Sequence, residues 1–127
     1  MKTFEDQVSE YLAALGGTAR EDAYHRLIEL GPGVIPPLRR RFLNERDPAI
    51  RTMLVNIAWQ SDVSGALVLL KEALDDREPD VWKEALDGLS TVGGPVALEV
   101  MRECRTRAIG DKADWLDEAI EHVTDAS

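Results

Sequence analysis

The chain has 127 residues, one cysteine and a net charge of −9, because 24 acidic residues outnumber 15 lysines and arginines. That length suits one domain over 1–127, and a lone cysteine excludes an internal disulfide. The negative charge would repel a phosphate backbone, which disfavours nucleic acid as a partner. No apolar run of about eighteen residues occurs, so we expect no membrane span, and the acidic start lacks the pattern of a secretory leader. The expected location is therefore cytoplasmic.

Apolar residues at helical spacing recur from one end of the chain to the other and predict an all-α fold. Thr18 and Glu21 predict a capping box at the start of the second helix. Asp47 is the predicted cap of the fourth helix, with Pro48 in its first position. In chain order, the expected helices cover about 3–15, 19–30, 34–43, 48–60, 63–74, 79–92, 95–107 and 111–123.

A period of 31 residues relates these helices in pairs. The segment 46–51 recurs at 77–82, and the apolar positions that follow each copy stay in register. A fixed period in this range indicates stacked repeats, because one helical pair cannot bury its apolar face alone. We therefore predict an α-solenoid of about four stacked helix pairs. The second helices share a register at Ala23, Leu54, Ala85 and Leu116, and the first helices share another at Tyr11, Phe42, Ala73 and Cys104.

The segment Asp47-Pro48-Ala49-Ile50-Arg51 resembles the second-helix signature of HEAT repeats. The short period, with 85–94 reading ALDGLSTVGG, is similar to the HEAT-like repeats of phycobilisome-lyase relatives. The resemblance covers most of the chain and implies that the second helix of each pair lines a concave face. It also implies bonds between acids and arginines of successive repeats. By position the acids are Asp47 and Glu78, the arginines are Arg20 and Arg51, and Trp82 and Ala113 replace the later arginines.

The residue types that carry chemistry fit structural roles. His25 lies one helical turn from Glu21 and Glu29, which would make a weak metal site, but a solvated charged face is the favoured interpretation because metal sites need three or four convergent ligands. Cys104 has an apolar register and is expected in the core. The sequence contains no nucleophile elbow, phosphate-binding loop or zinc-ligand spacing. We therefore expect no catalytic residue, no metal, no cofactor and no enzymatic activity.

The side of the second helices that faces away from the core stripe is the candidate binding surface. Trp59 on this side is either a binding anchor or a ring that lies on a neighbouring helix, whereas Trp82 and Trp115 are expected to pack. Residues 111–125 contain six acids against Lys112 alone. The candidate partner-binding residues are Thr52, Asn56, Trp59, Asp87, Asp114, Glu118 and Glu121.

These features favour a non-enzymatic module that binds a partner protein through its concave face. The acidic charge would suit a basic partner, but the favoured interpretation of that charge is that it keeps a small protein soluble. The mechanism would be shape complementarity around an aromatic anchor, with the acids setting encounter rate and specificity. One concrete form is a bacterial immunity-type protein that masks a basic toxin. Two alternatives stay open: a lyase-like or chaperone-like helper that holds a small ligand or pigment in the groove, and a self-assembling scaffold.

Overall fold

The computed structural model describes residues 1–126, and the prediction of an all-helical fold is confirmed over this range. None of the helices described is long and apolar enough to cross a membrane. The elements are α1 (Phe4–Ala14), α2 (Arg20–Glu29), the 3-10 helix η1 (Pro32–Val34), α3 (Ile35–Asn44), α4 (Pro48–Ser61), α5 (Leu67–Leu74), α6 (Pro79–Val92), α7 (Gly94–Arg105) and α8 (Gly110–Ala126).

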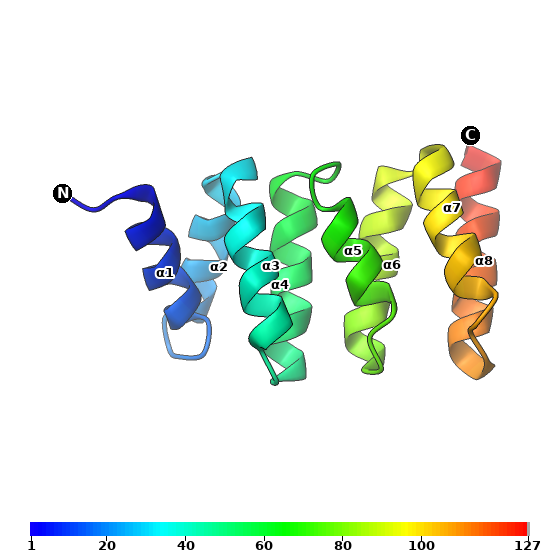
Figure 1. The fold of residues 1–127 in the computed structure, drawn as a ribbon, viewed down its shortest axis with the longest axis horizontal. Coiled ribbons are helices and arrows are strands. Elements are labelled where there is room, and N and C mark those ends of the chain that lie inside the picture. The colour runs from blue at the N-terminus through cyan, green and yellow to red at the C-terminus, as the bar shows by residue number, and fades with distance from the viewer. Residues whose placement is uncertain (127) are drawn as a thin grey trace.

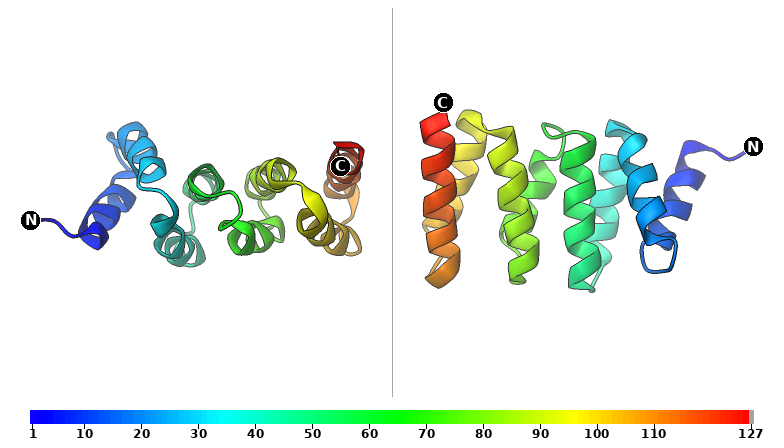
Figure 2. Two further views of the ribbon diagram at one scale, coloured as in Figure 1. Left: turned by 90° about the horizontal axis from the view of Figure 1, so that it is seen from above. Right: turned by 180° about the vertical axis from the view of Figure 1, so that it is seen from behind.

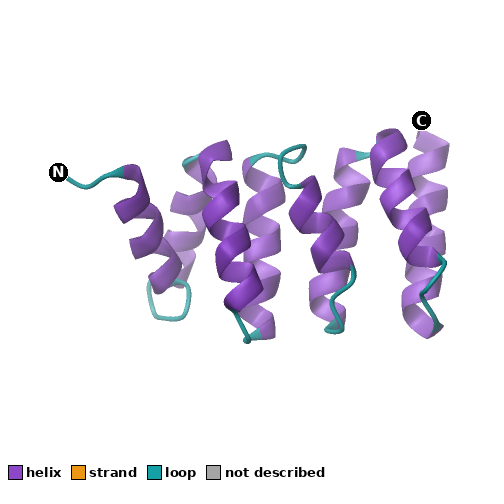
Figure 3. Ribbon diagram, viewed as in Figure 1, coloured by secondary structure: helices purple, strands orange, loops and turns teal. Residues whose placement is uncertain are grey.

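The helices follow one another along the long axis of the molecule in two layers (Figure 1). We call α1, α3, α5 and α7 the odd layer, and α2, α4, α6 and α8 the even layer. Each even helix packs on the next, so that α2 contacts α4, α4 contacts α6, and α6 contacts α8. Seen from above, α2 and α8 stand forward of α4 and α6, which makes the even layer shallowly concave (Figure 2). Turns and short loops join the helices at both ends of the layers (Figure 3).

A continuous core of apolar side chains fills the space between the two layers. The predicted register of the second helices is confirmed, because all four of its residues are buried. In the register of the first helices, Phe42, Ala73 and Cys104 are buried and Tyr11 is half-buried at the end of the stack. Burying a leucine or isoleucine side chain stabilises a fold by about 1.5–3 kcal/mol. The stabilisation is therefore spread along the whole stack, with a contribution from each helix pair.

The ends of the first two helices differ from the sequence prediction. Thr3 caps α1, since its hydroxyl accepts from the Asp6 amide at 3.1 Å while the Asp6 carboxylate accepts from the Thr3 amide. The capping box predicted at Thr18 is wrong, because α2 begins at Arg20 and its cap residue, Ala19, makes no side-chain bond. The Arg20 side chain bonds the turn that precedes α2, since its Nε donates to the Leu15 carbonyl at 2.7 Å.

The predicted cap of α4 is confirmed, whereas α5 is shorter than predicted. Asp47 accepts a hydrogen bond from the Ala49 amide at 2.9 Å. Residues 62–66 form a turn in which the Ala66 amide donates to the Asp62 carbonyl at 2.9 Å, so α5 begins at Leu67. Gly65 fits this turn because an added Cβ would lie 2.2 Å from a carboxylate oxygen of Asp62. The turn therefore replaces the first helical turn that the apolar spacing predicts.

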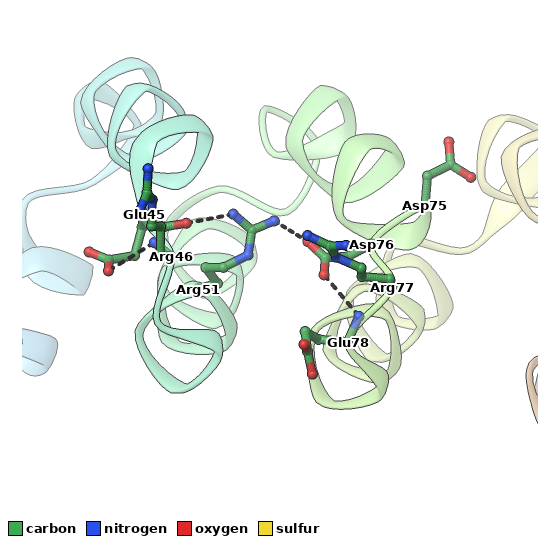
Figure 4. A pocket seen from close by; sticks show the side chains of 7 residues that line it. All are labelled: Glu45, Arg46, Arg51, Asp75, Asp76, Arg77 and Glu78. Atoms are coloured by element: carbon green, nitrogen blue, oxygen red, sulfur yellow. Dashed lines mark hydrogen bonds and ion pairs between the residues drawn. The ribbon is translucent and has the colours of Figure 1, made fainter.

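Arg51 joins the second and third helix pairs. Its guanidinium donates to the Phe42 carbonyl at 3.0 Å and to the Glu45 carbonyl at 2.8 Å, and it forms an ion pair with the Asp76 carboxylate (Figure 4). The guanidinium also lies 4.2 Å from the centre of the Phe42 ring. The Asp76 side chain is only 7% exposed, so this charge depends on Arg51 for compensation.

The acid that bonds Arg51 is two residues earlier than the HEAT-like resemblance implies. The Glu78 amide donates to an Asp76 carboxylate oxygen at 3.0 Å, which orients Asp76 toward Arg51. Asp47, the other acid that the resemblance suggests, accepts from the backbone at the start of α4. The described contacts of Arg20 are within its own turn rather than with the next pair.

Replacement of Arg51 by alanine tests this link. We expect Arg51→Ala to lower the free energy of unfolding by about 3 kcal/mol, because it leaves the largely buried Asp76 carboxylate without a positively charged partner. Urea denaturation followed by circular dichroism measures the change. Arg46→Ala is the matched control, since Arg46 lines the same cleft and its guanidinium makes no described bond. Equal destabilisation by the two variants would contradict the role assigned to the pair.

Candidate functional site

All seven candidate partner-binding residues lie on the even layer, and they fall into two groups. Those of α4 are half-buried and bonded within the molecule, whereas those of α6 and α8 are exposed. The first group is Thr52, Asn56 and Trp59, and the second group is Asp87, Asp114, Glu118 and Glu121.

A chain of hydrogen bonds connects α2, α4 and α6 across the even layer. The Tyr24 hydroxyl donates to the side-chain oxygen of Asn56. The Asn56 amide donates to Glu84 Oε2 at 3.2 Å, and the Trp59 indole NH donates to the same oxygen at 2.9 Å. Burial, together with the negative charge of Glu84, raises the pKa of Tyr24. These side chains therefore hold three helices in fixed positions.

Trp59 is a ring that lies on a neighbouring helix, which was one of the two alternatives that its position allowed. At Gly88 of α6, an added Cβ would lie 2.9 Å from Trp59 Cδ1 and 2.7 Å from Leu70 Cδ2. Gly88 thus lets the indole approach the α6 backbone. Thr52 is also occupied, since its hydroxyl donates to the Pro48 carbonyl at 2.8 Å. The three α4 residues of the candidate set therefore stabilise the even layer through bonds and contacts within the molecule.

The exposed aromatic side chain of the even layer is Trp115 on α8. Its ring and the Trp82 ring make a T-shaped contact with a centroid separation of 6.1 Å and an interplanar angle of 81°. The prediction that both indoles pack is confirmed for Trp82, which is 5% exposed. Trp115 also packs, on the Trp82 ring of α6, but it remains 42% exposed.

Two lysines lie over these indoles. Lys83 Nζ is 4.7 Å from the centre of the Trp115 ring and 5.7 Å from that of Trp82. Lys112 Nζ is 5.6 Å from the centre of the Trp82 ring. Over residues 1–126, neither ammonium forms an ion pair with a carboxylate. The faces of the two rings are thus positions that a cation occupies in this molecule.

The four acids of the second group are exposed and have no ion-pair or hydrogen-bond partner for their carboxylates within residues 1–126. Partial burial raises the pKa of Asp87. Some acids elsewhere are paired, as when Arg105 Nε bonds Asp117 at 2.8 Å and Arg39 Nε bonds Glu72 at 2.6 Å, whereas others, such as Glu5 and Glu99, are exposed and unpaired. The candidate acids differ from these because three of the four lie on one helix, α8.

Two other depressions on the surface are lined by residues that indicate no particular kind of ligand. A cleft of about 560 Å³ between the α3–α4 and α5–α6 turns is lined by charged residues, and the Arg51–Asp76 pair lies across it (Figure 4). A second depression, of about 500 Å³, lies between α2 and α4 beside Tyr24, His25 and Met53. Among residues 1–126, no three His, Cys, Asp or Glu side chains converge as metal ligands. Cys104 is buried, as expected, and burial raises the pKa of its thiol.

Comparison with known proteins finds no family model and no curated protein that matches this chain. The geometry and charge of the even layer are therefore the basis for assigning a function.

Replacement of Gly88 by alanine tests the docking of Trp59. Alanine normally stabilises a helix by about 1 kcal/mol relative to glycine. Here we expect a net loss of about 1–2 kcal/mol, because the added methyl group would overlap Trp59 and Leu70. Thermal unfolding measures the loss, and a red shift of Trp59 fluorescence would accompany it. Gly16→Ala is the control, since its added Cβ would have only an ordinary contact at 3.9 Å. A stabilised Gly88→Ala variant would contradict the close packing described.

Titration of Tyr24 tests the chain of hydrogen bonds. In a Tyr11→Phe background, absorbance at 295 nm follows Tyr24 alone, since the chain has two tyrosines. We expect Glu84→Gln to lower the pKa of Tyr24, because it removes the neighbouring negative charge that disfavours the phenolate, while burial keeps the pKa above about 10. Glu29→Gln on α2 removes the same charge away from this chain of bonds and should leave the titration unchanged. An unaltered titration in Glu84→Gln would exclude the coupling.

Proposed function

We propose that this chain is a HEAT-like α-solenoid of four helix pairs that serves as a non-enzymatic protein-binding module. Three observations support the solenoid. The helices occupy two layers in chain order, the 31-residue register is buried in every pair, and Arg51 and Asn56 bond to the following pair. A stack of this kind presents one extended face whose residues come from successive second helices.

The partner that this face suits best is a basic protein. The observation that carries the proposal is an exposed indole, Trp115, on a surface with four unpaired carboxylates. Burying an unpaired carboxylate is costly, whereas burying it against an arginine or lysine of a partner offsets much of that cost. The concentrated negative charge also accelerates encounter with a positively charged protein. Like charge on two copies of α8 disfavours self-assembly through the same surface.

The residues that we assign to the contact are Trp115, Asp87, Asp114, Glu118 and Glu121. Trp115 takes the anchor role that the sequence offered to Trp59, since exposed tryptophan is enriched among residues that dominate binding energy. Asn56 and Trp59 act indirectly, by fixing the spacing of α4 and α6. Thr52 keeps its bond within α4.

Charge reversal on α8 tests this proposal. We expect immobilised parent protein to retain a basic partner from an extract of the native host at low salt, and Asp114→Lys/Glu118→Lys to lose it by at least tenfold. The control is Glu5→Lys/Glu99→Lys, which reverses two exposed acids of the odd layer and should bind as the parent does. Quantitative mass spectrometry of the retained proteins measures the difference. Retention by the α8 variant, or loss with the odd-layer control, would contradict the assignment of this face.

A further inference from the structure

We propose that the face of Trp115 is a binding site for the guanidinium of an arginine, and that Lys83 is a built-in competitor for it. This inference rests on the proposed function and names the side chain by which a basic partner would be recognised. It also predicts a preference for arginine over lysine, which net charge alone does not produce.

The ring of Trp115 is held in a defined position. Trp82 is nearly buried, so the core of the molecule fixes its ring. Trp115 packs edge-to-face against that ring, which restricts its own orientation. The contact leaves 42% of Trp115 exposed, so part of the ring is accessible to a ligand. A rigid aromatic face loses little conformational entropy when a ligand stacks on it.

The position of Lys83 shows which kind of group this face attracts. Its ammonium lies 4.7 Å from the Trp115 ring centre and has no carboxylate partner within residues 1–126. Asp87 follows Lys83 by one helical turn, but an ion pair at this spacing is stronger when the acid comes first, and the structure places the ammonium on the indole. The aromatic face is therefore the position that this cation takes.

A guanidinium suits the same position better than an ammonium. It is planar, so it can stack on the indole, and it is less strongly hydrated than an ammonium. Carboxylates for its remaining N–H groups lie on the same side of α8: Asp111 is four residues before Trp115 and Glu118 is three residues after it, and both are exposed and unpaired. Arginine bonds carboxylates in a fixed fork, which adds directional hydrogen bonds to the stacking.

Lys83 then sets a threshold for binding. An incoming cation must displace the ammonium from Trp115 before it can stack. A lysine would exchange one ammonium for another, whereas an arginine would gain the stacked and forked contacts. The site would therefore select arginine-bearing surfaces and discriminate against surfaces that are merely basic.

Two peptides and three variants test this inference. The probes are acetyl-Gly-Arg-Gly-Arg-Gly-amide and its lysine counterpart, titrated into the full chain at low salt while the Trp115 indole NH is followed by NMR. We expect the arginine peptide to shift this resonance and to bind more tightly than the lysine peptide. Lys83→Ala should raise the affinity for the arginine peptide about two- to fivefold, because it removes the competing ammonium. Lys83→Arg should lower that affinity, because its guanidinium stacks more firmly on Trp115.

Charge effects are separated by the design of the variants. Lys83→Arg keeps the net charge, so a purely electrostatic site would bind as the parent does. Lys71→Ala removes one positive charge from the odd layer and should leave the affinity unchanged. Trp115→Phe, which retains an aromatic ring and threatens the fold less than alanine, should reduce the preference for arginine.

The outcomes distinguish this inference from the proposed function. If both peptides bind equally, and Lys83→Arg equals the parent, the guanidinium site is overturned while binding to basic partners survives. If neither peptide binds at low salt, and no basic protein is retained by the parent, both are overturned. An arginine preference that responds to Lys83 and Trp115 in the stated directions supports the site.

Discussion

A helix pair in this chain has more apolar surface than its two helices can cover for each other. Leu54 of α4 and Ala85 of α6 are fully buried, and α4 and α6 pack on each other, so adjacent pairs contribute to one core. Apolar contact alone would allow adjacent pairs to slide. Arg51 restricts sliding between the second and third pairs, because a largely buried carboxylate at Asp76 must meet its guanidinium. The position of the even helices, and hence of the exposed acids, follows from that constraint.

Paired and unpaired acids are unevenly distributed over the molecule. Glu72 of the odd layer is neutralised by Arg39 of α3. Asp117, on α8, is likewise held by Arg105 of α7. Asp114, Glu118 and Glu121 of α8 have no such partners within residues 1–126, whereas the unpaired acids of the odd layer, such as Glu5 and Glu99, lie on separate helices. Like charges on one helix repel each other, and a bound cation would relieve that repulsion.

Periodicity in the sequence predicts burial well because burial repeats with the stack. The register of Ala23 and Leu54 could be identified without coordinates, and so could the cap at Asp47. The turn before α2 could not, since Thr18 and Glu21 have the pattern of a capping box while Arg20 bonds the turn instead. Two local patterns compete there, and the bond from Arg20 to the Leu15 carbonyl is the one that forms.

The sequence predicted which side of the helices forms the candidate surface, but it did not predict the role of each residue on that side. Helical spacing places Trp59 and Glu118 on the even layer, yet it does not show which side chains bond across helices. Tyr24 and Glu84 were missed because each forms its bonds with α4, at sequence separations of 25 to 32 residues. A search for polar pairs separated by roughly one repeat would have found them. The exposure of Trp115 was missed because its position next to the apolar stripe of α8 predicted packing, whereas its contact with Trp82 covers only part of the ring.

The even helices are joined by two different kinds of contact. Between α2, α4 and α6 the links include hydrogen bonds through Asn56 and Glu84, which are directional and fix both spacing and tilt. Between α6 and α8 the links that we find are the Trp82–Trp115 contact, the lysines above it and apolar packing. Apolar packing is non-directional, so we expect the tilt of α8 on α6 to be held less closely than the tilt of α6 on α4.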